Sequence, residues 1–147
     1  MIDSAMLPVA AAIFVFDLIV QNVDRRVDNP NCLVKGSELC IFDHELAFTH
    51  GMVIRWQPPW VVGGLKDFER PGKHIFRDKL SKMRIDYEPI RAAWANLADP
   101  RLVQYETELP VEWAGAAPSV RRALTLIRDA RTNIAACLEE VKRVLRS

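Results

Sequence analysis

The first strongly apolar stretch of the chain covers residues 5–20, where nearly every side chain is hydrophobic. Such a run predicts a helix that is apolar on all faces and must therefore be surrounded by the rest of the protein. Asp3 or Ser4 is expected to cap this helix, and Pro8 fits its first turn. The run is shorter than the roughly 18 to 20 residues that a membrane-spanning helix needs, and it contains Asp17. No membrane segment is predicted.

Two short β-prone runs follow, at residues 32–35 and 39–43, with Gly36-Ser37 between them. Glycine followed by a small polar residue is typical of a two-residue hairpin turn. A turn this tight fixes the pairing of the strands, so that Cys32 faces Ile41. The pattern predicts one small antiparallel hairpin.

The remainder of the chain has a helical pattern. Residues 49–73 are irregular, and a short helix is predicted at residues 74–83. A second helix is predicted at residues 87–97, with Asp99-Pro100 as its end. Residues 119–146 carry apolar side chains every seven positions and predict one long amphipathic helix. We therefore expect a mainly α fold with a small β-hairpin (α+β), in a single domain over residues 1–147.

Composition narrows the class of protein. The chain has 147 residues, of which half are hydrophobic and 27% are charged, and its formal net charge is +1. Near-neutral charge gives no general attraction to nucleic acid or to acidic membranes. Three cysteines without a CxxC pair disfavour a secreted disulfide framework. A cytoplasmic protein is expected, with the helix at residues 119–146 packed on its own domain or used for oligomer or partner contacts.

Candidate chemistry gathers around the hairpin. Residues 21–31 are polar and contain Asn-Pro, which is typical of a loop. The hairpin register returns Asp43 to the side of Asn29 and Asn31, near Asp24. Oxygen ligands of this kind suit Mg²⁺, and a carboxylate beside a metal-bound phosphate suits phosphoryl transfer.

Four short motifs in this region resemble a known family: Phe16-Asp17, Asn22-x-Asp24-Arg25, Asn29-Pro30-Asn31 and Ile41-Phe42-Asp43-His44. Together they make residues 14–48 similar to the catalytic core of the HipA-like kinases, bacterial relatives of protein kinases and phosphatidylinositol kinases. The resemblance extends weakly through residues 65–68 and 74–76. It implies an ATP-dependent kinase that uses Mg²⁺ and transfers phosphate to a hydroxyl acceptor.

The resemblance also implies roles for individual residues. Asp24 would be the catalytic base, and Asn29 and Asp43 would bind Mg²⁺. Asn31 would be an alternative metal-binding or structural asparagine, Arg25 would steady the loop, and both would be cofactor-binding residues. The implied supporting residues are Asp17, Asn22 and His44.

The chain departs from the family pattern in two places. His44-Glu45 follows the metal-binding aspartate, where such kinases carry a glycine or another small residue. The region before residue 14 is too short for a glycine-rich loop and a strand lysine. We therefore expect only a C-terminal lobe, with core motif 14–48, irregular lid or linker 49–73 and helical tail 74–147. Such a lobe would bind ATP weakly and would need a separate N-lobe polypeptide; a protein substrate is a further candidate partner.

Two other functions remain open. The chain could be a non-enzymatic module that binds a partner through residues 119–146, or a metal-dependent phosphoesterase built on Asp24, Asp43 and His44. His50 and His74 are interpreted as surface or packing histidines. A further set of basic residues is interpreted as solvated surface, with a phosphate-facing groove as the alternative: Arg55, Lys66, Lys73 and Arg77.

Overall fold

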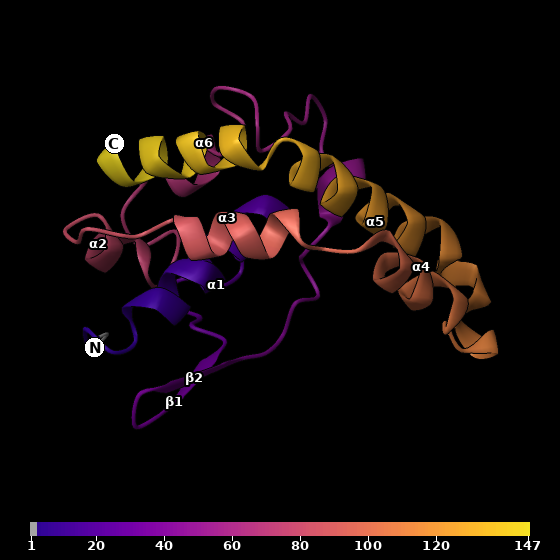
Figure 1. Ribbon diagram of the computed structural model, residues 1–147, viewed down its shortest axis with the longest axis horizontal. Helices are drawn as coiled ribbons and strands as arrows, with labels where there is room; N and C mark the ends of the chain where they lie inside the picture. Colours follow the sequence, from indigo (N-terminus) through magenta and orange to yellow (C-terminus); the bar gives the residue numbers. More distant parts are fainter. Residues whose placement is uncertain (1–2) are drawn as a thin grey trace.

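The computed structural model describes residues 3–147 and is mainly helical, with one two-stranded antiparallel hairpin (Figure 1). This arrangement confirms the predicted fold class. The helices and strands are α1 (Leu7–Val20), β1 (Cys32–Lys35), β2 (Glu38–Ile41), α2 (Arg77–Leu80), α3 (Glu88–Ala95), α4 (Asp99–Thr107), α5 (Ala117–Thr132) and α6 (Ile134–Arg146). Three short 3-10 helices connect them: η1 (Thr49–Met52), η2 (Lys66–Phe68) and η3 (Val111–Ala116).

The apolar helix α1 lies at the centre of the protein and contacts α2, α5 and α6. Its side chains at Phe14, Leu18 and Ile19 are almost completely buried, as expected of a helix that is apolar on every face. The helix begins one turn later than Asp3 or Ser4 would place it, and no side chain caps it directly; Asp3 instead accepts a hydrogen bond from the Met6 amide at 2.9 Å. None of the helices within residues 3–147 has the length and apolar character that a membrane crossing requires.

The hairpin has the predicted register, with Cys32 opposite Ile41 and Leu33 opposite Cys40. Gly36 has a φ of 60°, which a tight turn of this kind requires of its first residue. The second strand ends at Ile41 and not at Asp43 as predicted. Beyond the paired residues, the Phe42 amide still donates to the Asn31 carbonyl at 3.2 Å. That bond keeps the two ends of the hairpin together.

The prediction that Asp99-Pro100 ends a helix was only half correct. The preceding helix α3 stops at Ala95, but Asp99 and Pro100 are the first two residues of a new helix, α4. Proline fits a first helical turn because its missing N–H has no partner there in any case. Asp99 also forms an ion pair with Arg131 of α5 at 2.9 Å, so α4 is fastened to α5.

The prediction of one long helix over residues 119–146 was wrong. The chain bends at Asn133, which separates α5 from α6 and has non-helical angles of φ −106° and ψ 21°. The Asn133 side chain donates to the Asp129 carbonyl at 2.8 Å, a local side-chain bond that competes with regular helix. The bend lets α6 lie along α1 and α3, while α4 and the beginning of α5 extend to the far right of the view (Figure 1).

The end of α6 is fixed by Arg77. This side chain is 4% exposed and donates to the carbonyl oxygens of Val144 and Ser147 at 3.1 and 2.7 Å. Positive charge near the last carbonyls of a helix is favourable. Arg77 therefore stabilises the C-terminal end of α6 through these hydrogen bonds. It belongs neither to a solvated surface nor to a phosphate-facing groove.

Candidate functional site

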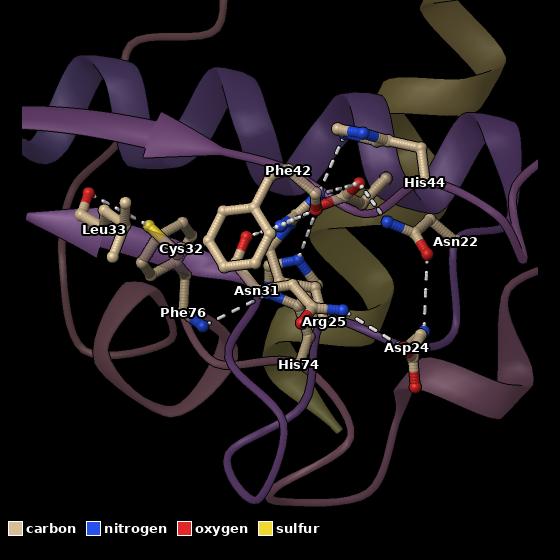
Figure 2. A network of polar contacts seen from close by, with 11 residues as sticks. Asn22, Asp24, Arg25, Asn31, Cys32, Leu33, Phe42, His44, His74 and Phe76 are labelled. Carbon is tan, nitrogen blue, oxygen red and sulfur yellow. Dashed lines mark hydrogen bonds and ion pairs between the residues drawn. The ribbon is translucent and has the colours of Figure 1, made fainter.

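A buried ion pair lies beneath the loop that follows α1. The Arg25 Nε atom donates to Asp17 Oδ2 at 2.6 Å, and Nη2 approaches Asp17 Oδ1 at 3.4 Å. Both side chains have no exposed surface. Asp17 comes from the central helix α1, so the ion pair fixes the loop residue Arg25 to the core of the protein. Figure 2 shows Arg25 in the middle of this network of polar contacts.

His74 and Asn22 complete the environment of Asp17. His74 Nε2 lies 3.1 Å from Asp17 Oδ2, and Asn22 Nδ2 donates to Asp17 Oδ1 at 3.0 Å. The Phe76 amide donates to His74 Nδ1 at 3.1 Å, so Nδ1 carries no proton and the neutral ring must carry it on Nε2, facing Asp17. The Asp17 carboxylate is thus fully hydrogen-bonded inside the protein.

The electrostatics of the pair follow from this geometry. Burial alone would raise the pKa of Asp17, but the hydrogen bonds from His74 and Arg25 outweigh it, and the pKa lies below its ordinary value. Burial lowers the pKa of His74 more than the neighbouring Asp17 raises it. The cluster therefore holds an ionised aspartate, an arginine and a neutral histidine at neutral pH. The expected packing role of His74 fits this position, but the hydrogen bond to Asp17 was not foreseen.

The outer end of Arg25 joins the two ends of the hairpin. Its Nη1 donates to the Asn31 carbonyl and, at 3.4 Å, to the Phe42 carbonyl. Its Nη2 lies 3.0 Å from His44 Nε2. Because a guanidinium only donates, His44 Nε2 is the acceptor. One buried cation thus holds the residues on either side of Asp43.

The polar loop brings Asp24, Asn29 and Asn31 into direct contact. Asp24 Oδ2 accepts from Asn29 Nδ2 at 2.8 Å and from Asn31 Nδ2 at 3.1 Å. Asp24 Oδ1 faces the Arg26 guanidinium at 3.8 Å, and 15% of the Asp24 side chain is exposed. Sequence reasoning had not singled out Arg26. The carboxylate is therefore oriented by two amides and a cation and still meets solvent.

Asp43 is placed differently from the other candidates. Its backbone has a φ of 55°, in the left-handed region, and its side chain is exposed. Within residues 3–147, its carboxylate makes no hydrogen bond or ion pair. The structure thus brings Asp24, Asn29 and Asn31 together by direct contacts, and it positions Asp43 only through its neighbours Phe42 and His44.

The donor set can be compared with the needs of a metal ion. Among the residues that the structure describes, no three His, Cys, Asp or Glu side chains gather as metal ligands. Mg²⁺, however, is commonly held by one or two carboxylates, with phosphate oxygens and water completing its shell. The exposed Asp43 carboxylate and the Asn29 amide oxygen are oxygen donors, whose chemistry suits a nucleotide-bound Mg²⁺. The described residues do not form a metal site from protein ligands alone.

Of three comparisons with known proteins, one gives a match. No curated protein and no solved structure gives a match to this chain. The family model described as HipA-like kinase matches residues 5–142, which is nearly the whole sequence. The match includes the central helix, the polar loop, the hairpin and most of the helical tail. The resemblance found in the motifs around Asp24 and Asp43 is therefore confirmed at the level of the family, and the chain belongs to the HipA-like kinases.

Proposed function

We propose that this chain is the C-terminal catalytic lobe of an ATP-dependent kinase. In this proposal Asp24 accepts the proton of the attacking hydroxyl, and Asn29 and Asp43 hold Mg²⁺. The main support is the contact of Asp24 with Asn29 and Asn31 at 2.8 and 3.1 Å, on a loop fixed from below by Arg25. A carboxylate oriented in this way meets the geometric need of a group that receives a proton.

The supporting residues would act through position and charge. Arg25 is fully buried, so we assign it to positioning the loop and the segment around Asp43 and not to contact with substrate. Asn31 would orient Asp24 and keep its amide oxygen near the metal. The bound Mg²⁺ would neutralise phosphate charge, which is the chief requirement of phosphoryl transfer.

A complete kinase also needs a lobe that grips the α- and β-phosphates. Residues 3–147 contain only a two-stranded sheet, with Gly36 alone at its turn and an exposed lysine, Lys35, at the end of β1. They therefore do not hold a glycine-rich loop on strands. We propose that this second lobe comes from outside the described residues and that the chain by itself binds Mg-ATP weakly.

The alternative functions have less support. The apolar side chains of α6 are buried against the protein, among them Cys137, Val141 and Val144. This part of the predicted partner-binding segment is therefore already covered by the rest of the protein. A phosphoesterase using His44 as a metal ligand would need a ring nitrogen with a free lone pair. A neutral imidazole has one such nitrogen, and in His44 it is Nε2, which already accepts from Arg25. Both observations favour the kinase lobe.

The proposal is tested by titrating the chain with a fluorescent ATP analogue in the presence of Mg²⁺. Asp43→Ala should weaken binding about tenfold or more, since it removes a charged metal ligand. Glu45→Ala is the matched control, because Glu45 is an exposed carboxylate two positions away. Equal affinities for the wild type and Asp43→Ala would remove the metal assignment.

A further inference from the structure

A cavity of about 560 Å³ lies between the irregular segment of residues 49–73 and helix α5. Cavities of roughly 300 to 1,000 Å³ are of a size that holds small ligands. The irregular segment supplies the rings of His50, Trp56 and Trp60 to its lining. Helix α5 supplies Arg122 and Asp129. We call this space the α5 cavity. It brings aromatic rings and two opposite charges together from segments that are distant in the sequence.

The α5 cavity is separate from the proposed catalytic site. Its lining includes none of the residues proposed to act in phosphoryl transfer: Asp24, Asn29, Asn31 and Asp43. The basic cavity beside Arg26 is also a different space, with Lys66, Arg70 and Lys73 in its wall. A ligand in the α5 cavity would therefore leave the proposed Mg-ATP site free.

Aromatic rings form the wall that the irregular segment provides. The rings of His50 and Trp56 lie 4.9 Å apart, with an angle of 40° between their planes. Trp56 Nε1 donates to Gln21 Oε1 at 2.5 Å, which fixes the indole in place. On the other side, Leu126 of α5 is 2% exposed and adds an apolar surface. Such a lining favours a flat aromatic ligand, and a nucleobase suits it because every base has a π face.

His50 leaves one polar atom of this wall without a partner. Its Nδ1 atom is buried and makes no hydrogen bond within residues 3–147. Burial and the neighbouring Arg122 charge lower the pKa of His50, so the ring is neutral at neutral pH. A buried polar atom of this kind needs a partner, which a ligand or a water molecule can supply.

Charged side chains of α5 in the cavity are available for a ligand. Arg122 donates to the Ser119 hydroxyl at 2.9 Å but forms no ion pair within residues 3–147. Arg121, by contrast, is paired with Glu106 at 3.2 Å. The Asp129 carboxylate has neither a hydrogen bond nor an ion pair among the same residues. The cavity thus offers one free cation and one free carboxylate.

The spacing of these two charges limits the choice of ligand. Arg122 and Asp129 are seven positions apart on α5, so they share a face and lie about 10 Å apart along the helix axis. A ligand that satisfies both must carry an anionic group at one end and N–H donors at the other. A free amino acid cannot do so, because its carboxylate and ammonium groups are bonded to the same carbon atom. A nucleotide can, since its ribose separates the phosphate from the base.

The Asp129 carboxylate also distinguishes between the purine bases. Guanine presents two neighbouring N–H donors, at N1 and N2, and both can reach one carboxylate. Adenine presents an amino group beside a ring nitrogen whose lone pair would face the same carboxylate. Paired hydrogen bonds to a charged acceptor add both strength and selectivity. A free carboxylate at this end of the cavity therefore favours guanine.

We infer that the α5 cavity binds a guanine nucleotide. The base would lie against Trp56 and Trp60, with its N–H edge at Asp129. The phosphate would meet Arg122. This site is additional to the proposed Mg-ATP site and does not depend on the proposed kinase activity.

The test is isothermal titration calorimetry of the intact chain with GMP. EDTA is present throughout, so that Mg²⁺-dependent binding at Asp43 does not contribute. IMP lacks only the 2-amino group of GMP and should bind at least about fivefold more weakly, because one hydrogen bond to a charged acceptor is lost. In Asp129→Ala the difference between GMP and IMP should disappear. Glu38→Ala removes an exposed carboxylate outside the cavity and should keep the difference.

Two further variants test the phosphate end and the location of the site. Arg122→Gln should bind GMP at least about tenfold more weakly and leave the affinity for guanosine unchanged, because guanosine has no phosphate. Arg84→Gln is the control, since Arg84 is exposed and lies outside the cavity lining. Thr125 is exposed and lines the cavity, so Thr125→Trp should fill the space and abolish GMP binding without unfolding the chain, as thermal denaturation would show.

Several results would overturn the inference. These are no binding of GMP, equal affinities for GMP, IMP and AMP, or unchanged GMP affinity in Arg122→Gln. Tighter binding of indole-3-acetate, an aromatic carboxylate without the N–H edge of guanine, would also do so.

The outcome is independent of the proposed kinase function. Asp43→Ala should keep the wild-type affinity for GMP, and loss of GMP binding in this variant would place the nucleotide in the proposed kinase site and contradict the inference. Failure of Mg-ATP to bind, with GMP bound as expected, would contradict the kinase proposal and leave the guanine nucleotide site standing.

Discussion

The guanidinium of Arg25 reaches the Asp17 carboxylate at 2.6 Å in a space that admits no solvent. Asp17 belongs to the central helix, and Arg25 follows the proposed catalytic base directly. The same guanidinium contacts the carbonyl oxygens of Asn31 and Phe42 and the His44 ring. The position of the whole loop relative to the hairpin therefore depends on one buried ion pair.

Removing one member of this pair should be costly. Asp17→Ala leaves the Arg25 charge buried without a partner, and we expect the free energy of unfolding to fall by about 3–5 kcal/mol. Urea denaturation measures the loss. The control is Glu88→Gln, which breaks an exposed ion pair with Arg91 and should leave the denaturation midpoint nearly unchanged. A similar small effect from both substitutions would show that the pair does not hold the fold.

Stability should also depend on pH through His74. Its pKa is lowered in the folded protein, so the unfolded chain takes up a proton first as the pH falls below about 6.5. The free energy of unfolding then decreases with falling pH, by at most about 1.4 kcal/mol per pH unit for this one group. Asp17 acts in a lower window: its stabilising contribution is present above about pH 3.9 and is lost as the pH falls through its lowered pKa.

The variant His74→Gln separates this effect from the rest. Glutamine can still donate toward Asp17 but does not titrate. Urea denaturation between pH 7.5 and pH 5 should show a flatter dependence for the variant than for the wild type. Identical slopes would mean that His74 is not the titrating group.

Local sequence patterns predicted the fold well where interactions between residues close in sequence determine the structure. The Gly36-Ser37 turn fixes the hairpin pairing, and the apolar run before Asp17 can only form a buried helix. The bend at Asn133 could not be predicted from the heptad pattern, because the apolar spacing continues across it. The bend depends on how α6 packs against α1 and α3. Such packing between distant segments cannot be predicted from the local sequence around Asn133.

The candidate site divides in the same way. Asp24, Asn29 and Asn31 share one loop, so their closeness follows from the chain itself. His74 reaches Asp17 from 57 residues away, and three basic residues of the cavity beside Arg26 come from residues 66–73. Contacts between distant segments leave no spacing signal, so the sequence alone did not predict either of them.

Replacing Gly64, in the irregular segment of residues 49–73, by a larger residue should destabilise the protein. A Cβ atom at this position would overlap the Pro58 carbonyl oxygen and lie 3.0 Å from the Val61 oxygen. Since both obstacles are backbone, Gly64→Ala should lower the free energy of unfolding by roughly 1–3 kcal/mol. Gly115→Ala is the control, because nothing lies within 4 Å of its Cβ position. Thermal denaturation compares the two, and equal stability would contradict the close approach at Pro58.

Asp24 and Asp43 should have separable effects, because the proposal gives them different tasks. Asp24→Asn keeps the shape of the side chain and lies outside the assigned metal ligands, so Mg-nucleotide affinity should change little, while phosphoryl transfer should fall by about a hundredfold or more. Asp43→Ala should weaken nucleotide binding first. Transfer is measured with radiolabelled ATP, and we expect the chain alone to give a weak signal because residues 3–147 contain no second lobe. Strong autophosphorylation by the isolated chain would contradict the need for that lobe, and unchanged transfer in Asp24→Asn would remove Asp24 as the base.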